Sequence, residues 1–345
     1  MDDRSWREDS GPALAEALVD VLLRGLAAAP PSFPQRATND ARGTVAALLA
    51  LSAPTADLQH GAGTILLAGR MPESQRLVQG TLGSLLDLWL TPVPRKWTPR
   101  EAAQAAYLLA LSLGLILGSR HGTPHIGVLR AELARRVAAF AVRYAPRRLP
   151  EAYERHWDAL DFALEDAARE RLLQAAFDLL VSHGFESIQV ARLADDAGVP
   201  RDTARSWYPT NHDLVADALR HGHQVGLAAN EAAQDRLARG FGPGVAEAVM
   251  MREFMRPGRE PQRAAVLEQI RMCWADPDLL ASSQRELSAL ADRMRRAGLG
   301  GSGFAHVEWA MGLGVVALAV ISPPTWQLPF DVVTVPLLEP ANLSA

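Results

Sequence analysis

The apolar residues of this chain recur with the three- and four-residue spacing of helices almost throughout, and the alternation typical of strands is nearly absent. The pattern is sharpest over residues 168–222. Three amphipathic segments of decreasing length follow one another there, separated by Gly184 and Gly198, and a fourth then begins. We therefore expect an all-α protein in which residues 168–222 form a compact unit of short helices.

The first two segments of this unit each have one apolar face, and the third is bounded by prolines. It runs from about Pro200 to Tyr208, because proline suits a first helical turn and Pro209 would break the helix. The apolar stripes of the first two segments consist of Leu172, Leu173, Ala176, Phe177 and Leu180, and of Val190, Leu193, Ala194 and Ala197.

The third segment has a polar outer face. Ala204 and Tyr208 lie four residues apart and are expected to pack inward. The side chains then expected to face outward include Arg201, Thr203, Arg205 and Trp207. Thr210 followed by Asp213 has the spacing of a capping box that opens the fourth helix. A short helix held across another by a tight turn is the geometry that enters a DNA major groove.

In this stretch the chain resembles the tetracycline-repressor (TetR) family of transcription regulators. The resemblance is carried by His183-Gly184-Phe185, by V-A-R-L-A-D-D-A-G-V over residues 190–199, by Thr203 and by Tyr208-Pro209. It implies a helix-turn-helix head that binds an operator in double-stranded DNA. The residues it places at or near the DNA are Gln189, Arg201, Thr203, Arg205, Trp207 and Tyr208.

Several positions depart from the family pattern. Pro200 stands where a serine is usual, Arg205 and Trp207 replace a tyrosine and a histidine, and Asn211 replaces a lysine. Residues 169–222 contain six arginines and eight acidic residues, a net charge of −2. Because phosphate contacts supply much of the affinity of such heads, we expect weak binding or dependence on another unit.

An internal repeat has an offset close to 200. Arg4-Ser5-Trp6 matches residues 205–207, and Gly25-Leu26-Ala27-Ala28 matches residues 226–229. Tyr107 and its apolar helix fall opposite Trp309 at an offset of 202. Further matches at an offset of 205 pair Ile65, Pro72, Gln79, Leu82, Leu85 and Asp87 with Ile270, Pro277, Gln284, Leu287, Leu290 and Asp292.

The repeat predicts four regions. Residues 1–145 form a degenerate core copy without a head, 146–167 a helical connector, 168–222 the head and 223–345 a second core copy. Met1 falls inside what would be the recognition helix of the first copy, so that copy is expected to have the remnant of a fourth helix over Ala13–Ala29 and a ligand-domain core, but no head. Either the gene lost this head or the start codon lies further upstream.

Family members pair two chains through their last two helices, so the two copies are expected to pack on each other as an internal pseudo-dimer, with a homodimer as the alternative. The apolar helices Glu101–Gly118 and Val307–Ile321 would be central. A helix over Ile126–Tyr144 would follow the first. No long helix is expected after the second, because of Pro323, Pro324, Pro329, Pro336 and Pro340.

The second copy is rich in bulky, adaptable side chains that line apolar pockets in other proteins. The family resemblance implies a small apolar effector there, whereas helical spacing also fits plain core packing. The pocket candidates are Met251, Met255, Met272, Trp274 and Trp309.

Composition adds mild limits. A net charge of −4 and a single cysteine, Cys273, fit a cytoplasmic protein without disulfides. The most apolar run, Tyr107–Leu117, is too short to span a bilayer. The G-x-G-x-x-G pattern at Gly298–Gly303 follows a helix rather than a strand, and Gly122 and Pro124 separate His121 from His125. We expect no cofactor, metal or enzymatic activity.

These patterns together predict a DNA-binding transcriptional regulator, a repressor released by a small apolar effector. The alternative is an interaction protein that does not bind DNA and instead sequesters a TetR-type partner or a ligand.

Overall fold

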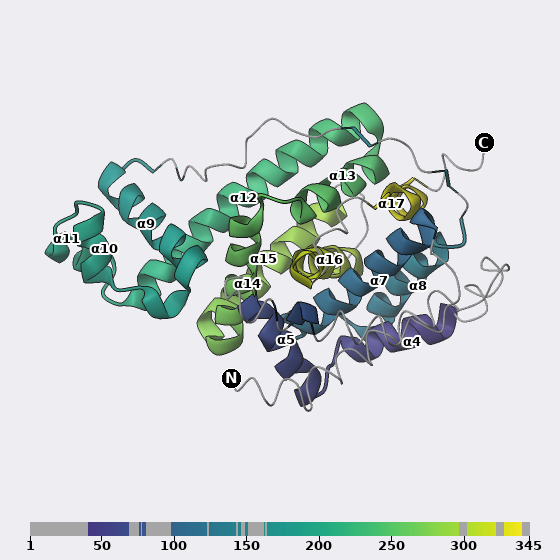
Figure 1. The fold of residues 1–345 in the computed structure, drawn as a ribbon, viewed down its shortest axis with the longest axis horizontal. Helices are drawn as coiled ribbons and strands as arrows, with labels where there is room; N and C mark the ends of the chain where they lie inside the picture. Colours follow the sequence, from purple (N-terminus) through teal and green to yellow (C-terminus); the bar gives the residue numbers. More distant parts are fainter. Residues whose placement is uncertain are drawn as a thin grey trace.

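The computed structural model describes residues 41–68, 76, 78–80, 98–122, 124–142, 144–145, 149–150, 162, 164–296, 302–321 and 328–339. Every regular element in these ranges is helical, in agreement with the expected all-α class. The helix expected over Ala13–Ala29 and most of the connector 146–167 lie outside them. Figure 1 shows a small group of helices at one end, a larger helical body, and one long helix running from the first into the second.

The small group is the expected unit of short helices, and we call it the head. It comprises α9 (Ala167–His183), the single turn η3 (Phe185–Ser187), α10 (Val190–Asp196) and α11 (Arg201–Trp207). Gly184 and Gly198 have φ values of 80° and 66°, which favour glycine because it has no Cβ. The predicted apolar stripes of α9 and α10 are buried, except that Ala197 is partly exposed.

The long helix α12 (Asn211–Phe241) begins with the predicted capping box, in which Thr210 and Asp213 cap each other's backbone amides. It continues through the boundary expected at residue 222, so the head and the body share one helix. Its first part packs in the head core through Leu214, and its later part packs in the body through Leu237. Gly222 allows a close approach, because a Cβ there would lie 2.5 Å from the Phe177 ring.

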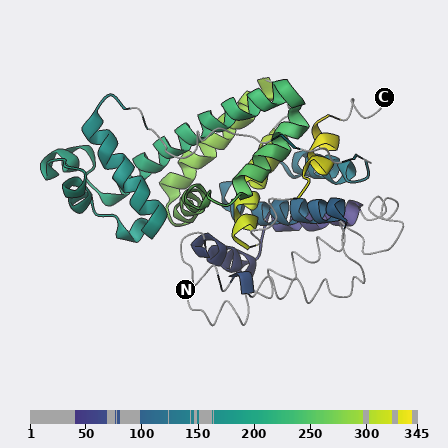
Figure 2. The same ribbon diagram turned by 45° about the horizontal axis from the view of Figure 1, so that its top comes forward.

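The body combines helices from both halves of the chain around one apolar core. The first half contributes α4 (Ala41–Leu51), α5 (Ala56–Ala68), α7 (Pro99–Gly118), the turn η2 (Ser119–His121) and α8 (Ile126–Ala139). The second half contributes α13 (Pro243–Met255), α14 (Glu260–Ala275), α15 (Pro277–Arg296), α16 (Ser302–Ile321) and α17 (Asp331–Leu338). Figure 2 shows the body from a second direction, with the head again at one end.

The most extensive helix pairing in the described structure joins α7 to α16. The helices cross where Gly114 lies against the backbone of Ala310 and Gly314 lies against the backbone of Ala110. A Cβ built on either glycine would overlap the opposing carbonyl oxygen. Gly314 lies 200 positions after Gly114, and Ala310 lies 200 positions after Ala110, so each helix makes the same contact to the other. Such reciprocity is what a two-fold axis between them would produce.

The helices that follow α7 and α16 differ from each other. Helix α8 ends at Ala139, five residues before the predicted end at Tyr144, and residues 140–142 form a turn. Helix α17 has only eight residues and contains Pro336. A short helix agrees with the expectation from the proline-rich sequence, because proline removes a backbone donor and crowds the preceding turn.

Two helices of the described residues are long and apolar enough to cross a membrane, Pro99–His121 and Ser302–Val320. In each, 83% of the most apolar window is buried against the rest of the protein. They therefore form the centre of the body in this fold.

Candidate nucleic-acid interface

Helix α11 is held across α10 by the turn at Gly198. Within this turn, the amide of Val199 donates to the carbonyl oxygen of Ala194 at 2.8 Å. Ala204 lies on the inner face of α11 and is fully buried, so α11 packs on the head core through this face. In Figures 1 and 2, α11 lies at the end of the head that is farthest from the body.

The inner face of α11 ends at Tyr208, which is 3% exposed. Its hydroxyl donates to Asp217 Oδ2 at 2.6 Å and accepts from Arg169 Nε at 2.8 Å. Arg169 also donates to Asp217 at 2.7 Å. Burial raises the pKa of Tyr208, and Arg169 opposes this rise. Although the family resemblance places Tyr208 at the DNA, its ring and hydroxyl are engaged inside the head, where they fix the end of α11 to α9 and α12.

Sequence reasoning did not identify Asp217, which is 5% exposed and also pairs with Arg220. The signal in the sequence is an acidic residue set among the apolar positions of α12, beside Val215 and Ala218. A buried carboxylate of this kind needs cationic or hydroxyl partners. Asn211, an exposed residue at the start of α12, also has a structural role, because its Oδ1 accepts from the Val190 amide at 3.0 Å and so caps the first turn of α10.

The outer face of α11 carries the predicted contact residues. Arg205 is exposed, and Thr203 and Trp207 are partly exposed. Gln189 is exposed at the N-cap of α10, where its side chain makes no capping hydrogen bond. Within the part of the chain that the structure describes, Arg205 makes no ion pair. Its guanidinium is therefore available to an anionic partner.

Arg201 differs from Arg205, because an acidic neighbour already occupies it. Its Nε donates to Asp195 Oδ1 at 2.8 Å, and its second nitrogen pairs with Asp195 Oδ2. The hydrogen bond from Arg201 lowers the pKa of Asp195. This bidentate pair joins the end of α10 to the start of α11 and offsets one of the positive charges on the outer face.

The remaining charges on the surface of α10 and α11 also balance. Arg192 lies 4.0 Å from Asp196, and Asp202 is exposed next to Arg201. Three arginines and three aspartates therefore share this surface. The expectation of weak DNA binding has a local basis here, because the face that would meet phosphates has no excess of positive charge.

Helix α14 connects the head to the body. Glu268, which is 2% exposed, accepts a hydrogen bond from the Phe185 amide at 3.0 Å. Arg271 pairs with Glu268 at 2.6 Å and with Glu186 at 2.9 Å. A movement of α14 would therefore move the turn between α9 and α10.

The structure separates the predicted pocket residues into two places. Met272 is 5% exposed and belongs to the head core, whereas Met251 and Met255 are buried in the body core. Trp274 donates from Nε1 to the carbonyl oxygen of Leu117 at 3.1 Å. The expected grouping of all five around one space is not seen, because α14 turns Met272 toward the head.

Trp309 fills the space beside the end of α7. A Cβ on Gly118 would lie 2.6 Å from this ring, and the ring of His121 lies 4.5 Å from it. His121 is 4% exposed, whereas His125 caps α8 by accepting from the Gly127 amide at 3.2 Å. The two histidines therefore have separate structural roles.

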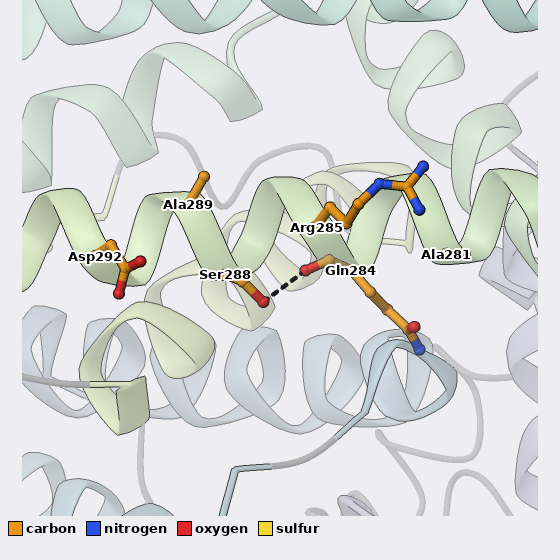
Figure 3. A pocket seen from close by; sticks show the side chains of 6 residues that line it. All are labelled: Ala281, Gln284, Arg285, Ser288, Ala289 and Asp292. Carbon is orange, nitrogen blue, oxygen red and sulfur yellow. Dashed lines mark hydrogen bonds between the residues drawn. The ribbon is translucent and has the colours of Figure 1, made fainter.

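An open depression of about 540 Å³ lies along one face of α15. Figure 3 shows that the side chains around it come from this single helix, and most of them are polar. None of the predicted pocket residues lines it. The lining residues are Ala281, Gln284, Arg285, Ser288, Ala289 and Asp292.

Two further features concern the possible chemistry of the chain. Among the described residues there is no group of three or more His, Cys, Asp or Glu side chains placed to hold a metal. Cys273 is buried, and burial raises the pKa of its thiol to about 12. The thiol is therefore protonated at neutral pH.

Comparisons with protein-family models, with curated proteins and with solved structures found no match for this chain.

Proposed function

We propose that this chain is a DNA-binding transcriptional regulator with a TetR-type head, in which α11 is the recognition helix. The observation that carries the proposal is the form of α11. It is a short helix, set across α10 by a glycine turn, anchored from below by Ala204 and Tyr208, and polar on its outer face. This is the arrangement by which helix-turn-helix proteins place side chains in a major groove.

The outer residues have different proposed roles. Arg205 contacts a base edge or a phosphate, since its charge is free, and Thr203 and Trp207 contact the sugar-phosphate backbone beside it. Gln189 reaches a phosphate from the start of α10. Tyr208 positions α11 from within the head and does not touch DNA.

In this proposal the body is an internal pseudo-dimer of two core copies. The reciprocal contacts of α7 and α16, 200 residues apart, support it together with the repeat in the sequence. A small apolar effector would act where the halves meet, near Trp274 and Trp309. Its binding would shift α14, and through Glu268 the head, between two populated orientations. If the orientation with bound effector releases DNA, the protein represses its genes only in the absence of the effector.

Fluorescence anisotropy with DNA from the intergenic region beside the gene, and with scrambled DNA, tests this function at two salt concentrations. We expect preferential binding that weakens with salt and a loss of about 1–3 kcal/mol in Arg205→Ala. Arg130→Ala is the matched control, because Arg130 is an exposed arginine on α8 in the body. Equal loss in both variants would contradict a specific role for α11.

The balanced charge on the surface of α10 and α11 favours a second candidate, an interaction protein that sequesters a TetR-type partner or a ligand. It predicts that Arg205→Ala and Thr203→Ala leave function unchanged and that neither DNA is bound. The same anisotropy experiment therefore separates the two candidates.

A further inference from the structure

The body determines how many heads can reach one DNA duplex. We infer that this protein acts on DNA as a single chain and recognises a site without two-fold symmetry, with one α11 in one major groove. The inference rests on the proposed function and specifies the class of DNA site that it reads.

The first observation is that α7 of the same chain fills the contact face of α16. At the crossing, Gly114 meets Ala310 and Gly314 meets Ala110 by backbone-to-backbone contact, with no space for a Cβ. A second copy of the chain could use this face of α16 only if α7 first moved away. The strongest helix-pairing surface in the body is therefore already used within one chain.

A buried charge network lies beside the same contact, at the seam between the two halves of the body. Arg136 of α8 is 1% exposed, donates to the Tyr107 hydroxyl at 2.6 Å and to Glu132 at 2.7 Å, and pairs with Glu308 of α16. Moving α16 away would break the ion pair of Arg136 with Glu308 and uncover the apolar core around it, so the pairing of the two halves is stabilised by charge as well as by packing. Nearby, Arg135 donates to the carbonyl oxygen of Leu337 at 2.8 Å and joins α8 to the end of α17.

The rest of the described surface offers no comparable face for a second copy. Its large apolar side chains with substantial exposure are Ile126, Val128 and Phe241, and they lie on two different helices, α8 and α12. The depression on α15 is lined mostly by polar side chains. A stable homodimer buries about 800 Å² on each partner around an apolar centre. The surface described lacks such a centre.

A two-fold dimer reads two half-sites about 34–36 Å apart, and the symmetry of the operator mirrors that of the protein. In this chain the two-fold relation lies inside the body, between α7 and α16, and one head is described. A single head contacts a single half-site. The preferred DNA is therefore expected to lack a palindrome.

Light scattering of the purified 345-residue chain, followed by selection from a random duplex library, tests the inference. The duplexes should carry about 24 random base pairs, enough for two half-sites one helical turn apart. We expect a mass of 37.3 kDa for the free chain at micromolar concentration. We also expect an enriched sequence without two-fold symmetry and complexes of one chain per duplex. Arg205→Ala should reduce enrichment at least several-fold, and Arg130→Ala should leave it unchanged.

Two other results would overturn the inference in distinguishable ways. A palindromic sequence bound by two chains would overturn the single-chain reading and leave the proposed function standing. Failure to enrich any DNA would overturn the proposed function, and the inference with it. In that case the mass of the free chain would still report whether the α7–α16 face is closed to a second copy.

Discussion

At the scale of single residues, the head contains an anionic competitor for the surface that we propose binds DNA. Asp195 occupies the guanidinium of Arg201 in the way that a phosphate would, with two parallel hydrogen bonds. DNA binding must either break this pair or leave Arg201 out of the interface. Asp195 therefore lowers the number of arginines on the outer face that are free to pair with a phosphate.

Replacing Asp195 with asparagine should strengthen DNA binding. The change removes one negative charge and frees Arg201 for a phosphate, so we expect several-fold tighter binding and a salt dependence steeper by about one phosphate contact. Anisotropy titrations over a salt series measure both. Asp178→Asn is the control, since it removes an exposed carboxylate from α9. Equal tightening in the control would indicate a general charge effect.

Tyr208→Phe tests whether this residue positions α11 or contacts DNA. Loss of the hydroxyl leaves the buried Asp217 without one of its partners, so we expect the free energy of unfolding to fall by about 1–3 kcal/mol. Urea denaturation followed by circular dichroism measures this fall. Unchanged stability together with lost DNA affinity would instead make Tyr208 a direct contact.

At the scale of helices, the crossing of α7 and α16 depends on two small residues in each helix. Ala110 and Gly114 face Gly314 and Ala310, and the backbones approach too closely for any larger side chain at the glycines. Close backbone contact of this kind gains dispersion energy along both helices and also makes the crossing intolerant of added volume.

Gly314→Ala should destabilise the protein, because the added methyl would overlap the carbonyl oxygen of Ala110. Overpacking of this kind costs about 1–3 kcal/mol, which thermal or urea denaturation would detect. Gly312→Ala in the same helix is the control with the opposite sign. Its Cβ would meet nothing within 4 Å, and alanine favours a helix over glycine by about 0.5–1 kcal/mol. Similar effects of both changes would refute the close crossing.

At the scale of the whole molecule, acid acts on the seam between the halves. His121 of η2 and His306 of α16 are each 4% exposed, and their ring centroids lie 4.5 Å and 6.2 Å from that of Trp309. Burial lowers the pKa of both to about 4, and His306 adds to the effect on His121. The unfolded chain would take up these protons near pH 6.5, so stability is lost as pH falls from 6.5 toward 4.

His121→Phe should make the protein less sensitive to acid. The variant has to be compared with the natural chain, because other groups also change stability with pH. Burial and the neighbouring Glu308 raise the pKa of Glu247, so this carboxyl group adds stability as the pH falls, opposite to the two histidines. Between about pH 7 and pH 5 the variant should lose about 1–2 kcal/mol less stability than the natural chain, as measured by urea denaturation. His183→Gln, at an exposed histidine at the end of α9, should have the same pH dependence as the natural chain. Identical pH profiles for all three would contradict the prediction.

The sequence alone was sufficient for the helices α9, α10 and α11 and for the start of α12. The stripes of α9 and α10, the glycines at 184 and 198, and the capping box at Thr210 are local signals. Their physical causes act within a few residues, through helix periodicity, positive φ and the unpaired amides of a first turn. The inward direction of Ala204 follows from the same periodicity.

Only the tertiary structure decided which side chains meet across long separations. The pairing of Tyr208 with Arg169 and Asp217, the position of Met272 in the head core and the contact of Gly114 with Ala310 each join distant parts of the chain. Helical periodicity marks which face of a helix is apolar, but it does not specify the neighbour that covers this face. That choice depends on shape and on the partners of buried charges, which exist only once the helices have packed.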